Sequence, residues 1–236
     1  VISFASDPPR PLITENERDG LREALKRIPT TEILLGREVN GVLYLESEAD
    51  EKILYEWARI LDHPALNFFK RPFVHPLHSK NLKEAKDHFF ALRAIFPEIK
   101  GVCLLDGDNS EDPDEEMTRN GLLVLRWRRY EIENYLLLPS IIRRFVGLPD
   151  SNCLLDYIIE EEFWKQMPKG TNLFGDHVFL TRIKASEEFL EPLLKKLGKP
   201  TPKRDFYLLA AKMTLEEIHP EIIEKLDQIA NVLINN

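Results

Sequence analysis

The sequence predicts an α/β fold, in which a mostly parallel sheet carries helices on both faces and a helical region follows. Apolar runs rich in strand-forming residues alternate with amphipathic segments of helix length between residues 37 and 138. These runs are apolar throughout, which is typical of parallel strands that are buried on both faces. After residue 138, apolar residues recur at helical spacing, so we expect helices that pack against the sheet.

The predicted elements follow one another in a regular order. Residues 1–36 predict a strand at 1–5, a Pro-rich connection and an amphipathic helix at about 19–28, which Pro29 ends. We then expect strands at 41–45, 73–77, 101–105 and 122–127, with helices at 49–61 and 82–96. The later helices are expected at 132–137, 139–146, 153–166, 186–197, 206–213 and 220–234.

Composition narrows the class of protein. No apolar run reaches the roughly 18 residues that a membrane-spanning helix needs, so we expect no membrane association. Cys103 lies in an apolar strand pattern and is expected to be a buried free thiol, which favours the reducing cytoplasm. The net charge of −8 disfavours a broad phosphate-binding surface. That argument weakens if clustered carboxylates hold divalent cations where a phosphate would bind.

Acidic residues gather where three of the predicted strands end. They are Glu46 and Asp50 after the first strand, Asp106 and Asp108 after the third, and Glu131 and Glu133 after the fourth. In an open parallel sheet, sites form outside the carboxyl ends of the strands, so we expect these side chains at one rim. Carboxylates held close together repel one another unless protons or cations lie between them. Their oxygen atoms favour Mg²⁺, Mn²⁺ or Ca²⁺ over zinc.

Each motif also has a purely structural interpretation. The Asp-Gly-Asp at 106–108 is typical of a turn, Asp50 is typical of a helix N-terminus, and Glu131 and Glu133 are compatible with a solvated surface. The occurrence of all three motifs at the carboxyl ends of predicted strands favours a metal site.

Basic residues supply candidate phosphate contacts. The stretch 195–204 contains five basic residues and no acid, and there we expect Lys199 and Arg204 to contact a nucleic-acid backbone. Arg128 and Arg129, after the fourth strand, are further candidates. The alternative interpretation of 195–204 is a solvated helix end followed by a Pro-rich loop.

Several of these motifs resemble a known family. Leu45-Glu46-Ser47-Glu48-Ala49-Asp50 resembles the Toprim Glu-Gly-x-x-Asp motif, with Ser47 in place of glycine, and Leu105-Asp106-Gly107-Asp108 resembles its Asp-x-Asp motif. The segment 126–139, with Trp127 and Glu133-Asn134-Tyr135, is similar to Toprim domains that are fused behind ABC-type ATPases. The OLD (overcoming lysogenization defect) proteins are examples of this fusion. The segment 57–64 also looks typical of these fused Toprim domains. The resemblance covers about residues 37–236.

The resemblance implies an organisation and a set of site residues. Residues 1–36 would be the exit from an N-terminal ATPase, 37–138 a Toprim (Rossmann-like) core, and 139–236 a helical part that completes the site. The implied metal ligands are Glu46, Asp50, Asp106, Asp108 and Glu133. The implied catalytic residues are Glu46, Asp106 and Lys203, with Lys212 as the second candidate for the late lysine and Glu131 as a weaker match than Glu133.

The implied function is a Mg²⁺- or Mn²⁺-dependent DNA endonuclease that uses two ions, with Ca²⁺ as a non-productive occupant. In that mechanism Asp106 would bridge the ions, Glu46 and Asp50 would hold one, and Asp108 and Glu133 the other. The implied partners are DNA, the N-terminal ATPase domain and further copies of the chain, in defence against phage or other foreign DNA. Two alternatives stay open: another Toprim chemistry (primase, topoisomerase or RNA-processing nuclease) and a non-catalytic interaction module.

Overall fold

A computed structural model describes residues 2–3, 10–11, 14–15, 19, 26, 28–39, 41–78, 82–108, 121–147, 153–175 and 177–234. Most of the helix expected at 19–28 and most of the strand expected at 1–5 lie outside these residues. Within them the chain forms an α/β fold with a parallel sheet, so the predicted fold class is confirmed.

The sheet has four parallel strands in the order β4-β3-β5-β6. Their bounds are Gly41–Leu45 for β3, Val74–Pro76 for β4, Lys100–Leu105 for β5 and Leu122–Arg126 for β6. All four strands were predicted within one or two residues of these bounds. A short antiparallel pair, β1 (Ile2–Ser3) and β2 (Arg10–Pro11), precedes the sheet in sequence.

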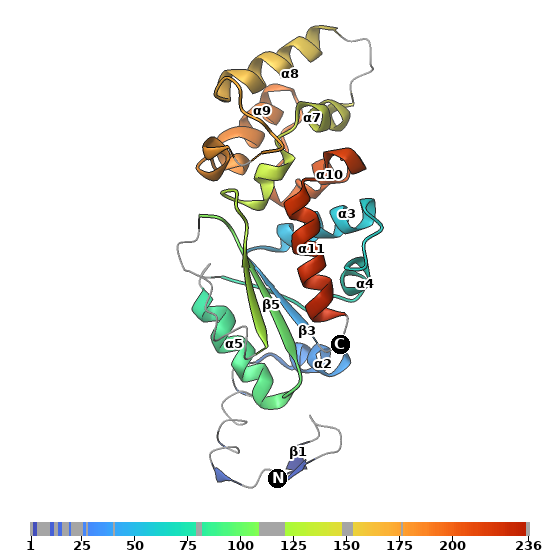
Figure 1. Cartoon of the computed structure of the whole chain (residues 1–236), viewed down its shortest axis with the longest axis vertical. Coiled ribbons are helices and arrows are strands. Elements are labelled where there is room, and N and C mark those ends of the chain that lie inside the picture. Colours follow the sequence, from blue (N-terminus) through green and yellow to red (C-terminus); the bar gives the residue numbers. More distant parts are fainter. Residues whose placement is uncertain are drawn as a thin grey trace.

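Helices cover both faces of the sheet (Figure 1). On one face lies α5 (Leu82–Ile95), and on the other lie α3 (Glu48–Ile60) and α11 (Pro220–Leu233). Successive side chains of a strand point to opposite faces. Leu43 and Leu45 therefore join the core under α3 and α11, while Val42 and Tyr44 join the core under α5.

Six further helices complete the described part of the chain, and all of them except α8 are shorter than these three. They are α2 (Thr30–Glu38), α4 (Leu66–Phe69), α7 (Pro139–Val146), α8 (Cys153–Gln166), α9 (Glu191–Lys196) and α10 (Tyr207–Ala210), with 3-10 turns at 132–136, 178–181, 203–205 and 215–217 and a π-helical turn at 185–190. Neither α2 nor α4 was predicted. Among the described residues, no helix is both long and apolar enough to cross a membrane.

Three helix predictions were wrong in detail: the helix expected at 206–213 is only Tyr207–Ala210, and a proline lies beside each of the other two. The segment 132–136 is a 3-10 turn; Pro139 holds Leu138 in an extended conformation, so the turn cannot continue into α7, which begins at that proline. The helix expected at 186–197 is divided into a π-helical turn and α9, whose second residue is Pro192. Proline lacks the N–H that an unbroken α-helix would need at this point.

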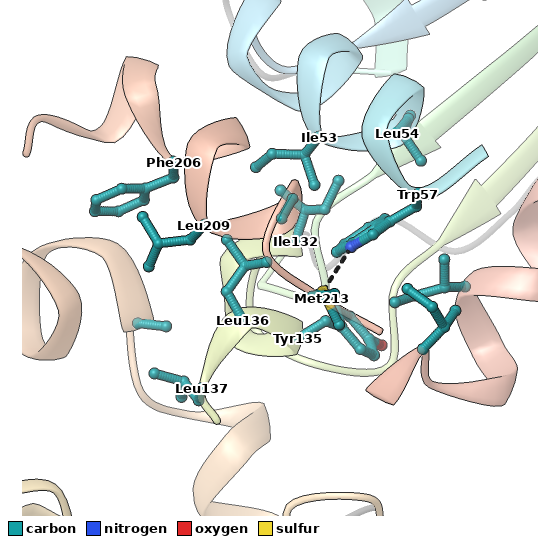
Figure 2. Close-up of a cluster of buried hydrophobic side chains, with 14 of the residues drawn as sticks. Ile53, Leu54, Trp57, Ile132, Tyr135, Leu136, Leu137, Phe206, Leu209 and Met213 are labelled. Carbon is teal, nitrogen blue, oxygen red and sulfur yellow. Dashed lines mark hydrogen bonds between the residues drawn. The ribbon is translucent and has the colours of Figure 1, made fainter. Parts of the chain in front are cut away.

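The sheet and the C-terminal helices share one apolar core (Figure 2). Trp57 of α3 is fully buried, and its Nε1 donates to the Sδ of Met213 at 3.0 Å. Trp57 also meets the rings of Trp127 and Tyr135 edge-on. This packing seats the 132–136 turn against α3, close to the carboxyl ends of the strands. The strand ends therefore face the helical C-terminal elements rather than open solvent (Figure 1).

Candidate metal centre

Three carboxylates converge at the ends of β3 and β5. Glu46 follows β3 and Asp106 follows β5, and with Asp108 they offer oxygen atoms that lie within 4.8 Å of one another. The backbone N–H of Asp106 donates to Glu46 Oε1 at 3.0 Å, which ties the two strand ends together. Asp106 is 5% exposed and Asp108 is exposed. The group therefore reaches from the core to the surface.

The turn between the two aspartates is held by the segment that follows β6. Asp106 Oδ1 accepts from the N–H of Ile132 at 3.2 Å, and the N–H of Asp108 donates to the carbonyl of Tyr130 at 3.2 Å. A Cβ on Gly107 would lie 2.0 Å from the carbonyl oxygen of Arg129. Glycine is needed here because another backbone passes against it.

Ser47 begins helix α3 and orients Asp50. Its hydroxyl donates to Asp50 Oδ1 at 2.6 Å and its N–H donates to Oδ2 at 3.1 Å, while the N–H of Asp50 points back at the Ser47 hydroxyl at 3.4 Å. This is a capping box. Ser47 has φ −151° and ψ 161°, an extended conformation in which any residue fits. Serine in place of the Toprim glycine therefore costs the backbone nothing.

Lys203 joins the site from the C-terminal helical part. Its Nζ lies 3.0 Å from Glu131 Oε2 and 3.2 Å from Glu133 Oε1, and both glutamates are buried. The other carboxylate oxygen of Glu131 accepts from the N–H of Ser186. Lys212 is exposed, and its carbonyl accepts from Arg144 at 2.7 Å. Of the two candidate lysines, the structure brings Lys203 to the acids.

Burial and mutual repulsion perturb the acids. The pKa of Asp106 is well above its ordinary value because of burial, then because of the nearby charges of Asp50 and Glu46. Burial raises the pKa of Glu133 to about 8, although Lys203 opposes the change. Burial also raises the pKa of Asp50, against the hydrogen bond from Ser47. Without a cation, burial and mutual repulsion therefore favour the protonated form of these carboxyls.

Lys203 is perturbed in the opposite sense. Burial lowers its pKa, but the charges of Glu133 and Glu131 outweigh burial, so the pKa of Lys203 is raised. The ammonium group therefore stays charged at neutral pH. Its side chain is 29% exposed, so a charged group approaching the rim can reach it.

The donor set fits a hard divalent cation. Glu46, Asp106 and Asp108 offer only carboxylate oxygens, which Mg²⁺ and Mn²⁺ prefer. Both oxygens of Glu133 are buried, and Oε1 forms the ion pair with Lys203. The sequence-based interpretation paired Asp108 with Glu133, whereas the structure groups Asp108 with Glu46 and Asp106 and places Glu133 against Lys203.

One expected phosphate contact is excluded. Arg129 is 3% exposed, and its guanidinium donates to the carbonyls of Asn134 at 2.9 Å and Leu173 at 2.6 Å. It also lies over the ring of Tyr135, at 4.5 Å from the centroid. The prediction for Arg129 was wrong because a local run of arginines says nothing about which member turns inward. Arg129 holds the segment after β6 in place.

The other basic candidates lie at the surface. Arg204 has a side chain that is 83% exposed and lies 4.0 Å from Asp205. Arg128 pairs with Glu224 at 3.1 Å. Lys199 donates to the carbonyl of Phe145 and lies over its ring. All three stay predicted phosphate contacts, and Arg204 presents the most accessible charge among them.

Asn134 is a structural residue that the sequence did not reveal. Its side-chain oxygen accepts from the N–H of Glu131 at 3.2 Å, and its nitrogen donates to the carbonyls of Leu180 at 2.9 Å and Ile183 at 3.0 Å. It therefore joins the turn that carries Glu131 and Glu133 to the segment that precedes Ser186. The only signal in the sequence was its place in the Glu-Asn-Tyr segment, which gives no partner.

Comparison with known proteins gives structural similarity alone. No protein family and no curated protein matches the sequence. Among solved structures, the chain is similar to the C-terminal region of the Burkholderia pseudomallei OLD protein, with 19% identity and a TM-score of 0.45 over 82% of this chain and 98% of that one. It is also similar to the C-terminal region of the Xanthomonas campestris pv. campestris OLD protein, phased with mercury (15% identity, TM-score 0.45) or iodine (17%, 0.42), over 82% of this chain and 95% of those.

Proposed function

We propose that this chain carries the catalytic centre of a Mg²⁺- or Mn²⁺-dependent nuclease that hydrolyses phosphodiester bonds in DNA. The observation that supports this proposal is the convergence of Glu46, Asp106 and Asp108 at the carboxyl ends of two adjacent parallel strands. Divalent ions, when bound to such a group, supply Lewis-acid stabilisation of phosphate charge and favour ionisation of water.

The residues of the chain divide the remaining work. Glu46, Asp106 and Asp108 hold a cation through their carboxylate oxygens, and Asp106 is their central member because it contacts both neighbouring strand ends. Asp50 and Glu133 add negative charge beside Asp106, which strengthens the preference for a divalent ion and suits the pair of ions that the resemblance implies. Removing the protons from these acids is part of binding the ion, so affinity rises with pH.

Lys203 acts on the phosphate side of the centre. Its ammonium group is held by Glu131 and Glu133 and stays charged. A fixed positive charge at this position stabilises the negative charge that develops on the phosphate during cleavage. The two glutamates are positioning residues for the lysine, and Ser186 holds Glu131 in turn.

The wider predictions from the sequence belong to this proposal. The substrate would be DNA, and Arg204, Lys199 and Arg128 would contact its backbone. In the whole protein an N-terminal ATPase domain would control access, the chain would act as a homo-oligomer in the cytoplasm, and the role would be defence against foreign DNA.

The proposal is tested with supercoiled plasmid, metal and two matched substitutions. We expect the wild-type chain to nick the plasmid with Mn²⁺ or Mg²⁺ and not with EDTA. Asp106→Asn is expected to reduce the rate more than about 100-fold, since even substitutions behind a metal ligand cost about 10- to 100-fold. The control Asp87→Asn changes an exposed acid of α5 and should cleave like the wild type.

Two results would contradict the proposal. One is equal cleavage by the wild type and by Asp106→Asn, which would assign the activity to a contaminant. The other is the absence of Mn²⁺ binding by the wild-type chain in calorimetry, which favours a non-catalytic interaction module. A single-stranded RNA of matched length, run beside the plasmid, distinguishes DNA cleavage from RNA processing.

A further inference from the structure

A second polar cluster lies on the side of the sheet that α5 covers. It is separate from the acidic rim, which is the group of carboxylates that follow β3, β5 and β6. Glu32 comes from α2, His75 from the edge strand β4 and His88 from α5. His75 Nδ1 lies 2.9 Å from Glu32 Oε1, and His88 Nε2 lies 2.7 Å from Glu32 Oε2. The two imidazole rings are stacked, with centroids 3.9 Å apart and planes 21° from parallel. Three elements that are distant in sequence therefore meet at one carboxylate.

The surroundings of the cluster are partly apolar and partly open. The side chains of Glu32, His75 and His88 are 16%, 15% and 9% exposed. Tyr44 of β3 is fully buried below them, and its hydroxyl lies 2.9 Å from His88 Nδ1. Tyr44 thus closes the cluster on its inner side, and the outer side is partly exposed.

We propose that Glu32, His75 and His88 form a binding site for one divalent transition-metal ion of the zinc class. Their three ligand atoms, a carboxylate oxygen and two ring nitrogens, lie within 4.8 Å of one another. Zinc takes imidazole and carboxylate ligands at about 2.0–2.2 Å, and two histidines with one glutamate are an established zinc ligand set. Small side-chain shifts bring these atoms to that distance, and water supplies the fourth ligand. The acidic rim offers oxygen ligands alone, so the two sites favour different metals.

Tyr44 supports the metal-bound form. When His88 Nε2 binds a metal, Nδ1 must carry the ring proton and donate it to a neighbouring acceptor. The Tyr44 hydroxyl is at hydrogen-bond distance from Nδ1 and can accept as well as donate. The same contact therefore fits His88 with and without metal, and it fixes the ring orientation in both.

The bound ion would join α2 to the sheet. Among the four parallel strands, β4 is an edge strand of three residues, and α2 lies directly before β3 in the chain. A metal that bridges α2, β4 and α5 stabilises their arrangement, because a ligand that binds only the folded state raises the free energy of unfolding. The proposed role is structural and is independent of nuclease activity.

The test is a titration of the chelator-treated full chain with Co²⁺, whose visible absorption reports imidazole coordination, followed by competition with Zn²⁺. We expect the wild type to bind one Co²⁺ at this site and to release it to Zn²⁺. His75→Asn and His88→Gln should lose this absorption, whereas Asp106→Asn at the acidic rim should retain it. The matched control is His78→Gln, which changes a neighbouring exposed histidine and should also retain it.

Tyr44→Phe keeps all three ligands and removes only the supporting hydroxyl, so it tests the site even if the histidine variants fold poorly. We expect it to weaken Zn²⁺ binding about 10- to 100-fold, with an unchanged far-UV circular dichroism spectrum. The proposal is overturned if the wild type takes up no Co²⁺ or Zn²⁺ in stoichiometric amount. It is also overturned if folded His75→Asn and His88→Gln give the wild-type Co²⁺ spectrum.

Discussion

The acidic rim and the Glu32 cluster both bury carboxylates beside the same sheet, yet their charges respond in opposite ways. At the rim, burial and then the neighbouring acids raise the pKa of Asp106 well above its ordinary value. In the Glu32 cluster burial also raises the pKa, but hydrogen bonds from His75 and His88 outweigh it and bring the pKa of Glu32 down to about 2. The neighbours therefore decide whether a buried carboxylate is stable as an anion.

This contrast separates two kinds of candidate metal site. The rim acids repel one another, so an added cation relieves repulsion that is already present. In the Glu32 cluster the carboxylate and the two imidazoles already form hydrogen bonds with one another. An added ion must replace these hydrogen bonds, so we expect its binding to be less favourable than binding at the rim. We therefore expect the rim to depend on a cation for its charged form, and the Glu32 cluster to fold without one. The following changes test that difference, from the largest expected effect to the smallest.

The largest effect is expected at Lys203, whose ammonium group lies against the buried rim glutamates. Replacing Lys203 with Met should lower the cleavage rate about 100- to 1,000-fold, the usual cost of removing a group that stabilises developing charge. Mn²⁺ binding, followed by calorimetry, should be retained, because the lysine is not a ligand. Lys212→Met is the matched control and should cleave normally. Equal losses in both variants would remove the distinction between the two lysines.

Removing one acid from each cluster should change stability in opposite directions. Glu32→Ala leaves two half-buried imidazoles without their shared acceptor, so the free energy of unfolding should fall by about 2 kcal/mol. Asp106→Asn removes an acid whose charged form would repel Asp50 and Glu46, so stability in EDTA, measured at a pH where that charged form is populated, should stay equal or rise. Urea unfolding of both variants without metal measures this. A similar fall in the free energy of unfolding of both variants would mean that the rim acids do not repel one another in the metal-free protein.

The pH dependence of the free energy of unfolding should also differ between the acidic rim and the Glu32 cluster. The folded pKa of Glu133, about 8, lies above the unfolded value of about 4.3. Its contribution to the free energy of unfolding is therefore complete below about pH 4.3 and is lost as the pH rises through about 8. Glu32 has a lowered pKa, so its contribution is present above about pH 4.3 and is lost as the pH falls towards about 2.

Thermal unfolding of the wild type and Glu133→Gln between pH 5 and about 9 in EDTA isolates the Glu133 contribution, because the other titrating groups are common to both proteins. We expect the melting temperature to fall less steeply with pH in Glu133→Gln than in the wild type. Mn²⁺ should also flatten the wild-type curve, since a cation takes the place of the protons. Parallel curves for the wild type and Glu133→Gln would argue against a strongly raised pKa at this residue.

The smallest effect is expected at Ser47, which gives the rim one of its few hydrogen-bond donors. Ser47→Gly should lower the free energy of unfolding by a few tenths of a kcal/mol, and Ser47→Ala by about 1 kcal/mol, because glycine is tolerated at the start of a helix and alanine is not. Chemical denaturation measures both. A loss in Ser47→Gly as large as that in Ser47→Ala would mean that the hydrogen bonds to Asp50, rather than the backbone at the N-cap, dominate.

The structure agrees with the sequence where local pattern is sufficient. Continuous apolar runs predicted all four parallel strands, and the rule that parallel strands present their carboxyl ends together predicted that Glu46 and Asp106 would meet. The ligand roles of the five predicted metal-binding residues stay predictions. Detailed helix bounds were less accurate, because α2 and α4 are short and the proline at 192 divided a predicted helix.

Other features of the structure depend on contacts with other segments of the chain, which no local sequence pattern predicts. Arg129 turns inward to carbonyls of residues 134 and 173, and Gly107 is required by the carbonyl of Arg129. The meeting of Glu32 with His75 and His88 was not predicted, since the three residues lie on separate elements with no shared motif.

The sequence by itself determined the parallel sheet and the collection of acids at its rim, because strand composition and the side-chain period of two act over a few residues. The resemblance favoured Lys203 over Lys212, and only the tertiary structure showed which of the two lies against the acids of that rim. Lys203 lies 70 residues beyond Glu133 in the chain, and it reaches the glutamates because the C-terminal helices pack on α3 in a shared core. Burial of that core sets the position of the lysine, and burial is a property of the whole fold rather than of any segment.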